Sequence, residues 1–223
     1  IMPPRERDGQ EPPRMVAEAL KATDVFIAPV SRSITHSRAV RDAVEAGVRG
    51  ILMTGVTEDM LIYGGIEADF KALKPLCEKV AKALESGRIA RVTSPAGTDI
   101  MMAVEGRHGS MMTCIVDRGQ VSPVPNVEAY ISPLEGTAEG IFVADASIPY
   151  AGIGVLKEPV ILKVEKGQIV DIKGGEQARM FKERLEEAKD PDVYNIAELG
   201  IGLNPKSRIT GRISDDEGVY GTA

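Results

Sequence analysis

Residues 24–54 read DVFIAPVSRSITHSRAVRDAVEAGVRGILMT, and this stretch decides the fold class. Its first part, 24–30, is a short apolar run closed by proline, which predicts a buried strand. Thr35 is placed to cap a helix that continues to about Ala46. A second apolar run at 50–54 predicts another buried strand. Strand, helix and strand in this order indicate a parallel β/α unit.

Helical patterns flank this unit on both sides. Residues 14–22 follow two prolines, and proline is favoured at the start of a helix. A longer apolar face, spaced by three and four residues, extends between Ile66 and Leu84. Pro75 interrupts this pattern, so we expect a kink or two abutting helices there.

After residue 88 the hydrophobic pattern changes from helical to strand-like. Apolar and polar residues alternate between glycine-rich turns, which is typical of half-buried strands. Lys166-Gly167 has the composition of a hairpin turn, and a further helix is predicted at about 176–189. The alternating segments are 89–94, 99–105, 110–116, 127–132, 140–145, 159–165 and 168–173.

These patterns predict an α/β protein in which an N-terminal parallel β/α unit precedes a larger, mixed, mostly antiparallel α+β domain. We place the two domains at residues 1–88 and 89–223. The first residue is not an initiator methionine, and the last residues read like the middle of a segment. We therefore expect that the first domain lacks its first strand and helix, and that the second is truncated at its C-terminus.

Composition narrows the class of protein. The net charge is −6, only 4% of residues are aromatic, and no basic stripe is present, which argues against a nucleic-acid partner. No window reaches the roughly 18 consecutive apolar residues of a membrane span, so no membrane partner is expected. Cys77 and Cys114 lie in regions of different pattern and make no disulfide framework, which favours a cytoplasmic location.

Few residues in this sequence have the chemistry of a catalytic site. His36 and His108 are the only histidines, and we interpret them as a neighbour of a helix cap and a solvated turn residue. Serine-nucleophile, phosphate-binding and Cys-x-x-Cys motifs are absent from the sequence. The sequence by itself therefore cannot build a histidine-rich metal site.

Four glutamates occupy unusual positions. Glu128 stands inside a strand-like segment, and Glu198 interrupts an apolar run, where a charge is costly to bury without a metal ion or a basic partner. Glu135 and Glu139 frame a glycine-containing turn, and we interpret them as solvated. Glu128 and Glu198 are therefore the candidate functional residues.

Three segments together resemble the aminopeptidase T and S family of metallopeptidases, which shares its fold with the 2,5-dihydroxypyridine dioxygenases. The likeness is good over about 88–223 and only topological before that. The segments are RVTSPAGTDI at 91–100, PNVEAYISP at 125–133 with its following EGTAEG, and IAELGIGLNP at 196–205 leading into the final GTA.

This resemblance implies a metal-dependent hydrolase that releases amino-terminal residues from peptides. Glu128 and Glu198 match metal-ligating glutamates of the family, and Glu198 is assigned the catalytic role as well. The cofactor implied is a pair of divalent ions, zinc, cobalt or manganese, bridged by carboxylates. The family's next histidine would follow Ala223, so this sequence would hold only part of the site. The resemblance also suggests a homodimer that acts on a peptide or another small molecule.

Two other functions remain open. An Fe(II)-dependent dioxygenase that cleaves the ring of a dihydroxypyridine-like N-heterocycle would use two histidines and one aspartate, one histidine falling near Glu198. A glutamate at that position favours the two-metal hydrolase over the dioxygenase. In a non-catalytic binding domain, Glu198 would instead pair with an arginine or a lysine.

Overall fold

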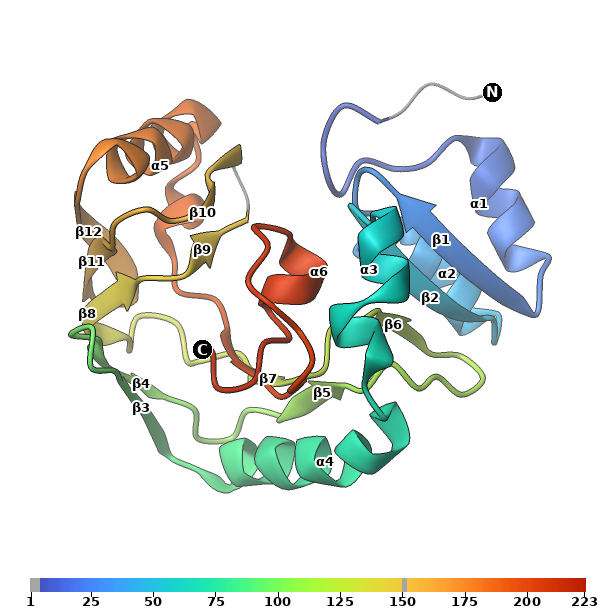
Figure 1. Ribbon diagram of the computed structural model, residues 1–223, viewed down its shortest axis with the longest axis horizontal. Coiled ribbons are helices and arrows are strands. Elements are labelled where there is room, and N and C mark those ends of the chain that lie inside the picture. Colours follow the sequence, from blue (N-terminus) through green and yellow to red (C-terminus); the bar gives the residue numbers. More distant parts are fainter. Residues whose placement is uncertain (1–4, 150–151) are drawn as a thin grey trace.

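The computed structural model describes residues 5–149 and 152–223 (Figure 1). The predicted parallel unit is present. Its sheet has the order β1-β2-β6, and both pairings are parallel. Two helices pack on one face of this sheet through a core that includes Leu20, Phe26 and Leu52. The elements are α1 (Arg14–Lys21), β1 (Val25–Val30), α2 (Arg38–Glu45), β2 (Arg49–Thr54) and β6 (Val121–Pro123).

Two details of this unit differ from the sequence-based expectation. The cap of α2 is Ser37, whose hydroxyl accepts the Val40 N–H, whereas Thr35 lies two residues earlier. Strand β1 is only half buried, because it is the edge strand and its second face is open. Val25 and Ile27 on that face are 47% and 66% exposed.

The long helical pattern forms a single helix preceded by a short turn. Asp69 caps α4 by accepting the Ala72 N–H, and Pro75 lies inside the continuous helix, so the expectation of two abutting helices is wrong. The predicted apolar face is the buried one, with Cys77 fully covered. The elements are α3 (Glu58–Ile62), the 3-10 turn η1 (Gly64–Glu67) and α4 (Phe70–Ser86).

The larger part of the chain is mostly antiparallel, as predicted, with a five-stranded, a three-stranded and a two-stranded sheet (β10-β9) among the described residues. The five-stranded sheet has the order β12-β11-β8-β4-β3, and α5 packs against it. Lys166 and Gly167, with φ of 48° and 77°, form the expected hairpin turn. The elements are β3 (Ile89–Thr93), β4 (Asp99–Ala103), β8 (Glu139–Ala144), β11 (Val160–Glu165), β12 (Gln168–Lys173) and α5 (Glu176–Ala188).

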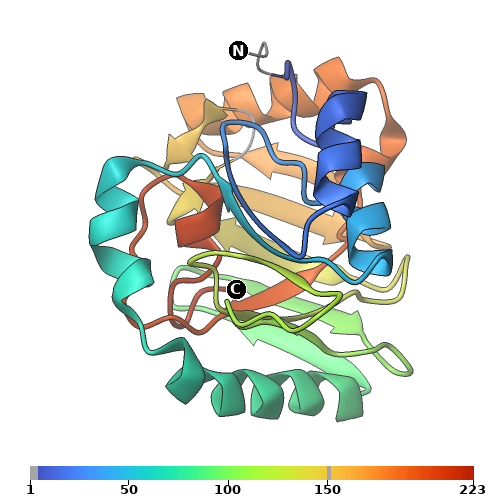
Figure 2. The same cartoon turned by 90° about the vertical axis from the view of Figure 1, so that its right-hand side faces the viewer.

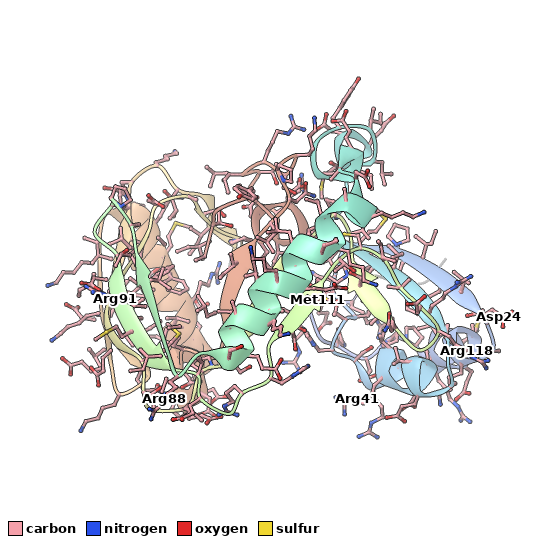
Figure 3. All side chains as sticks on the ribbon, turned by 90° about the horizontal axis from the view of Figure 1, so that it is seen from below. Asp24, Arg41, Arg88, Arg91, Met111 and Arg118 are labelled. Carbon is pink, nitrogen blue, oxygen red and sulfur yellow. The ribbon has the colours of Figure 1, made fainter. Side chains whose placement is uncertain are left out.

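The three-stranded sheet β13-β7-β5 lies against α4. Figure 3 shows Met111 of β5 beside this helix. Helices α4 and α5 lie on opposite sides of the molecule (Figure 2). The remaining elements are β5 (Ser110–Met112), β7 (Glu128–Ile131), β9 (Ser147–Ile148), β10 (Gly154–Val155), the 3-10 turn η3 (Pro191–Tyr194), β13 (Leu199–Gly202) and α6 (Ile213–Asp216).

The two parts of the chain are interleaved. Strand β6 follows the predicted boundary at residue 88 and yet is the third strand of the N-terminal sheet. Helix α6 returns from near the C-terminus to contact β2, and Figure 1 shows it between the two parts. The division at 88/89 stays a prediction, and the first unit is completed by residues from beyond it.

Two further expectations bear on the environment of the chain. Cys77 and Cys114 are free, and both contribute to the core between α4 and β7. Within the described ranges, no helix combines the length and the apolar character needed to cross a bilayer. The cytoplasmic location stays a prediction.

Asn204 joins three segments that are far apart in the sequence. Its side chain is fully buried, and its amide nitrogen donates to the carbonyl oxygens of Gly65 and Pro125, both at 3.0 Å. Its amide oxygen accepts the Lys206 N–H at 3.0 Å. Its backbone also pairs with the C-terminal segment, through Gly218 and Tyr220. One buried side chain therefore links η1, the entry to β7 and the segment after β13.

We expect Asn204→Ala to lower the free energy of unfolding by about 2–4 kcal/mol, because it leaves buried carbonyl groups without donors. Urea denaturation would measure the loss. Asn195→Ala is the matched control, since that amide makes a single bond, at 3.3 Å, with Gln168. A loss for Asn204→Ala no larger than that of the control would contradict the role of Asn204 as the link.

Candidate functional site

A cavity of about 310 Å³ lies between the two parts of the molecule. One wall is formed where the parallel strands end: Ser31 and Ser33 follow β1, Thr54 and Gly55 end β2, and Pro123 ends β6. Open α/β sheets bind ligands beyond the carboxyl ends of their strands. The position of the cavity is therefore the one expected for a ligand site.

The opposite wall is the three-stranded sheet. Successive side chains of a strand point to opposite faces. Val127 and Ala129 pack into the core under α4, while Glu128 and Tyr130 face the cavity. Glu198, just before β13, and Glu217, just after α6, line the same space. The fold thus brings together the two predicted glutamates and adds a third.

Gly200 leaves the space that the Glu128 carboxyl occupies. A Cβ built on Gly200 would lie 1.9 Å from Glu128 Oε1. The two residues are diagonal neighbours on adjacent strands, because Gly200 pairs with Tyr130 and Gly202 pairs with Glu128. Gly200, in the segment 196–205, is therefore required by the carboxylate of Glu128, in the segment 125–133. This explains why the two segments occur in the same protein.

Asn126 holds two of the carboxylates. It is fully buried, and its amide nitrogen donates to Glu128 Oε2 and to Glu217 Oε2, both at 3.1 Å. Glu128 is 5% exposed, and burial raises its pKa to about 7, with a further rise from Glu198 and an opposing effect of the Asn126 bond. The surrounding protein and the neighbouring carboxylates raise the pKa of Glu217 to about 8, although solvent reaches this side chain through the cavity.

The premise for selecting Glu198 was wrong in one respect. It was expected to be buried in an apolar run, whereas its side chain is exposed toward the cavity. Partial enclosure still raises its pKa, and the nearby His36 opposes that rise. An arginine or lysine partner for Glu198 is absent among the ion pairs of the described residues.

His36 and Tyr130 line the cavity, although the sequence alone gave neither of them a role in the site. His36 was interpreted as a neighbour of a helix cap, and Tyr130 is a strand residue between two core positions, but both line the cavity. His108 and Glu135 are placed as expected, in exposed turns, where they pair with Glu85 and Arg107. Glu139 lies at the start of β8 and accepts the Lys166 N–H.

Glu217 was missed altogether. The only sequence signal was its place at the end of the acidic run Asp215-Asp216-Glu217, directly before Gly218. The two aspartates are buried, and Asp216 accepts the N–H groups of Thr210 and Gly211, which fixes the loop that presents Glu217. An acidic run is more often a solvated surface, so the sequence alone did not indicate this role.

Carboxylates and an imidazole are donor types that mononuclear iron sites use, so the chemistry of these residues fits such a metal. The described residues do not complete its coordination: within residues 5–149 and 152–223, no group of three or more His, Cys, Asp or Glu side chains is arranged to hold a metal ion. These ranges therefore supply at most part of a metal site.

Comparison with known proteins identifies the family. The model of the NicX family, 2,5-dihydroxypyridine 5,6-dioxygenase, matches residues 6–221. The chain belongs to this family. A 2,5-dihydroxypyridine 5,6-dioxygenase of Pseudomonas putida is 25% identical over 197 residues, covering 86% of this chain and 54% of that protein. The chain thus spans about half the length of this curated relative.

Solved structures agree on the fold. The structure of 2,5-dihydroxypyridine dioxygenase from Pseudomonas putida KT2440 superposes on the present structure with a TM-score of 0.74 and 22% sequence identity. The match covers 92% of the present chain and 60% of the dioxygenase chain. Wild-type AmpT from Thermus thermophilus gives a TM-score of 0.61 and 11% sequence identity. The match covers 94% of the present chain and 65% of the AmpT chain. Both confirm the predicted α/β class with parallel and antiparallel parts.

The aminopeptidase interpretation is therefore wrong, and so is its description as a hydrolase, a metallopeptidase or a protease. The family match and the dioxygenase relative overturn it, while AmpT shares only the fold. The physical reason lies in the motifs that carried the resemblance. Gly200 and the strand pairing around Glu128 serve the shared fold, so they do not distinguish the reactions that it supports.

Gly200→Ala should destabilise the protein by about 1–3 kcal/mol, because the new methyl group meets the buried Glu128 carboxyl. Adding Glu128→Ala removes the obstacle and should recover part of this loss, which a double-mutant cycle by urea denaturation would measure. Gly87→Ala is the control, since its Cβ would come no closer than 3.2 Å to a neighbour. Strictly additive effects of Gly200→Ala and Glu128→Ala would contradict the close approach.

Proposed function

We propose that this protein is a ring-cleaving dioxygenase that acts on a dihydroxypyridine-like N-heterocycle and uses Fe(II). The observation that supports the proposal most strongly is the family match over residues 6–221. The cavity supports it independently, because its volume of about 310 Å³ is at the small end of ligand pockets, which suits one substituted ring.

The residues around the cavity supply proton chemistry for such a ring. His36 and Glu198 lie close enough to influence each other electrostatically, and both face the cavity. A hydroxylated ring becomes electron-rich, and easier to oxidise, when a hydroxyl group loses its proton. We propose that His36 accepts this proton. The hydroxyl-bearing wall after β1 would orient the ring.

Fe(II), when bound, supplies activation of dioxygen, and sites of this kind hold the metal with two histidines and one carboxylate. Glu128 and Glu198 remain the residues of this chain that we propose to face the metal. The expected homodimer also stays a prediction, which a measurement of mass in solution would test.

The protein, purified without oxygen, should contain about one iron ion per chain. Glu198→Ala should weaken iron binding by at least about 10-fold, because it removes a carboxylate from the cavity wall. Elemental analysis and a metal titration would measure both quantities. Glu135→Ala, at an exposed ion pair with Arg107, is the control and should keep the iron. Two zinc ions and no iron would contradict the proposed cofactor.

His36→Gln should lower kcat/KM for oxygen uptake with 2,5-dihydroxypyridine by about 100- to 10,000-fold, the usual effect of losing a general base. His108→Gln is a matched control, because His108 is the other histidine of the sequence and pairs with Glu85 in an exposed turn, away from the cavity. An oxygen electrode and the loss of ring absorbance would follow the reaction. Equal activity of the two variants would remove His36 from the mechanism, and no oxygen uptake by the unsubstituted protein would overturn the proposed function.

A further inference from the structure

The charges around the cavity are not evenly distributed. Glu128, Glu198 and Glu217 all belong to the wall formed by the antiparallel sheet and the adjoining α6 loop. Burial is the first cause of the raised pKa of each, and neighbouring carboxylates raise the pKa values of Glu128 and Glu217 further. Among the described residues, His36 opposes the rise at Glu198. The acidic wall is therefore not neutralised by an arginine or a lysine from the described residues.

Two more charged residues line the same cavity, Asp8 and Arg212. Asp8 accepts the Ser33 N–H and pairs with Arg32 at 3.8 Å, whereas Arg212 supplies a positive charge. It precedes α6 and lines the cavity, and its Nη1–H donates to the carbonyl oxygen of Gly55 at 3.3 Å. Gly55 directly follows β2, so the guanidinium lies at the carboxyl end of the parallel sheet. Among residues 5–149 and 152–223, no carboxylate forms an ion pair with Arg212. A single bond to one carbonyl leaves most of its five N–H donors available.

The loop that carries Arg212 is fixed at both ends. Asp216, which is buried, accepts the N–H groups of Thr210 at 2.7 Å and Gly211 at 2.9 Å. Ser214 donates its hydroxyl to the carbonyl oxygen of Thr54 at 3.2 Å. The bonds of Ser214 and Arg212 to adjacent carbonyls attach the loop to the end of β2. The loop is thus held in place before a ligand binds, which reduces the entropy that its ordering would cost on binding, while the side chain of Arg212 is exposed.

Resting on the proposed function, we propose that Arg212 is a specificity-determining residue that binds an anionic oxygen substituent of the ring substrate. The substituent is either a ring oxyanion or a carboxylate attached to the ring. Planar guanidinium groups recognise both through paired charge-assisted hydrogen bonds. The opposite end of the ring then faces Glu128, Glu198 and His36. The contact with Arg212 would then fix which way round the ring binds.

Arg208 provides a close control for this inference. It lies four residues earlier in the same segment, but its guanidinium pairs with Asp59 at 3.4 Å and does not line the cavity. Replacing Arg208 removes the same charge from the protein without changing the site. A difference between the two arginine variants therefore reports on position and not on net charge.

The experiment is calorimetric titration of the full-length, iron-loaded protein without oxygen, so that binding is measured without turnover. The two ligands are 2,5-dihydroxypyridine and 2,5-dihydroxypyridine-3-carboxylate. Arg212→Gln should raise Kd by about 10- to 100-fold, as expected for loss of hydrogen bonds to a charged group. Arg212→Lys should lose less than Arg212→Gln, because it keeps the charge, and Arg208→Gln should bind as the unsubstituted protein does. Thermal denaturation of each variant checks that the fold is retained.

The two ligands distinguish the sources of the anionic oxygen. Equal weakening of both identifies a ring oxyanion as the group bound, and weakening of the carboxylated ligand alone identifies the carboxylate. Unchanged binding of both ligands by Arg212→Gln and Arg212→Lys overturns the inference and leaves the proposed function in place. Failure of the unsubstituted protein to bind or oxidise either ligand overturns the proposed function, and the inference with it.

Discussion

The architecture depends on the buried amide of Asn204. It connects η1, the residue Pro125 that leads into β7, and the segment after β13, none of which are neighbours in the sequence. Two of these segments lead to walls of the cavity, because β7 carries Glu128 and Tyr130 and the segment after Asn204 carries Arg212 and Glu217. A buried amide with all its bonds made is specific in a way that apolar contacts are not, since any shift leaves a donor or an acceptor unpaired. The position of the cavity walls relative to each other therefore rests on this one side chain.

Much of the fold follows from the sequence, and the parts that do not follow have a common cause. Periodicity located α1, α2, β1, β2, the seven alternating segments and α5, because in those elements the pattern of burial is set locally. Strands β6 and β13 were not located: β6 lies outside the alternating segments, and two of the four residues of β13 are glycines, which give no alternation of apolar and polar side chains. Strand β6 even ends in proline and exists only because β2 offers it an edge. The open face of β1 was missed for the same reason, since its burial is decided by what packs against it and not by its composition.

The site was predictable to a smaller extent than the fold. Glu128 and Glu198 were found because a charge in an apolar context is conspicuous, even though Glu198 proved to be exposed. His36, Arg212 and Glu217 carry no such local signal. They reach the cavity from a turn after β1 and from a loop more than 170 residues further on, and only the tertiary structure places them together. Residues that act through convergence of distant segments cannot be recognised by spacing.

The acidic wall shows why fold and reaction can diverge within one architecture. Holding Glu128 and Glu217 on the same amide nitrogen, with Glu198 nearby, is unfavourable for stability, as the raised pKa values of all three carboxyls indicate. Apolar residues would pack there at lower free energy, so this arrangement is the kind that proteins keep for function. What offsets the negative charge is left to a cation, to protons or to a ligand, because no arginine or lysine of the described residues forms an ion pair with these three carboxylates. The same arrangement of carboxylates can then support different reactions, according to whether it binds a cation, protons or a ligand. The proposal of ring oxidation over peptide hydrolysis therefore rests on the family to which the chain belongs more than on the carboxylates themselves.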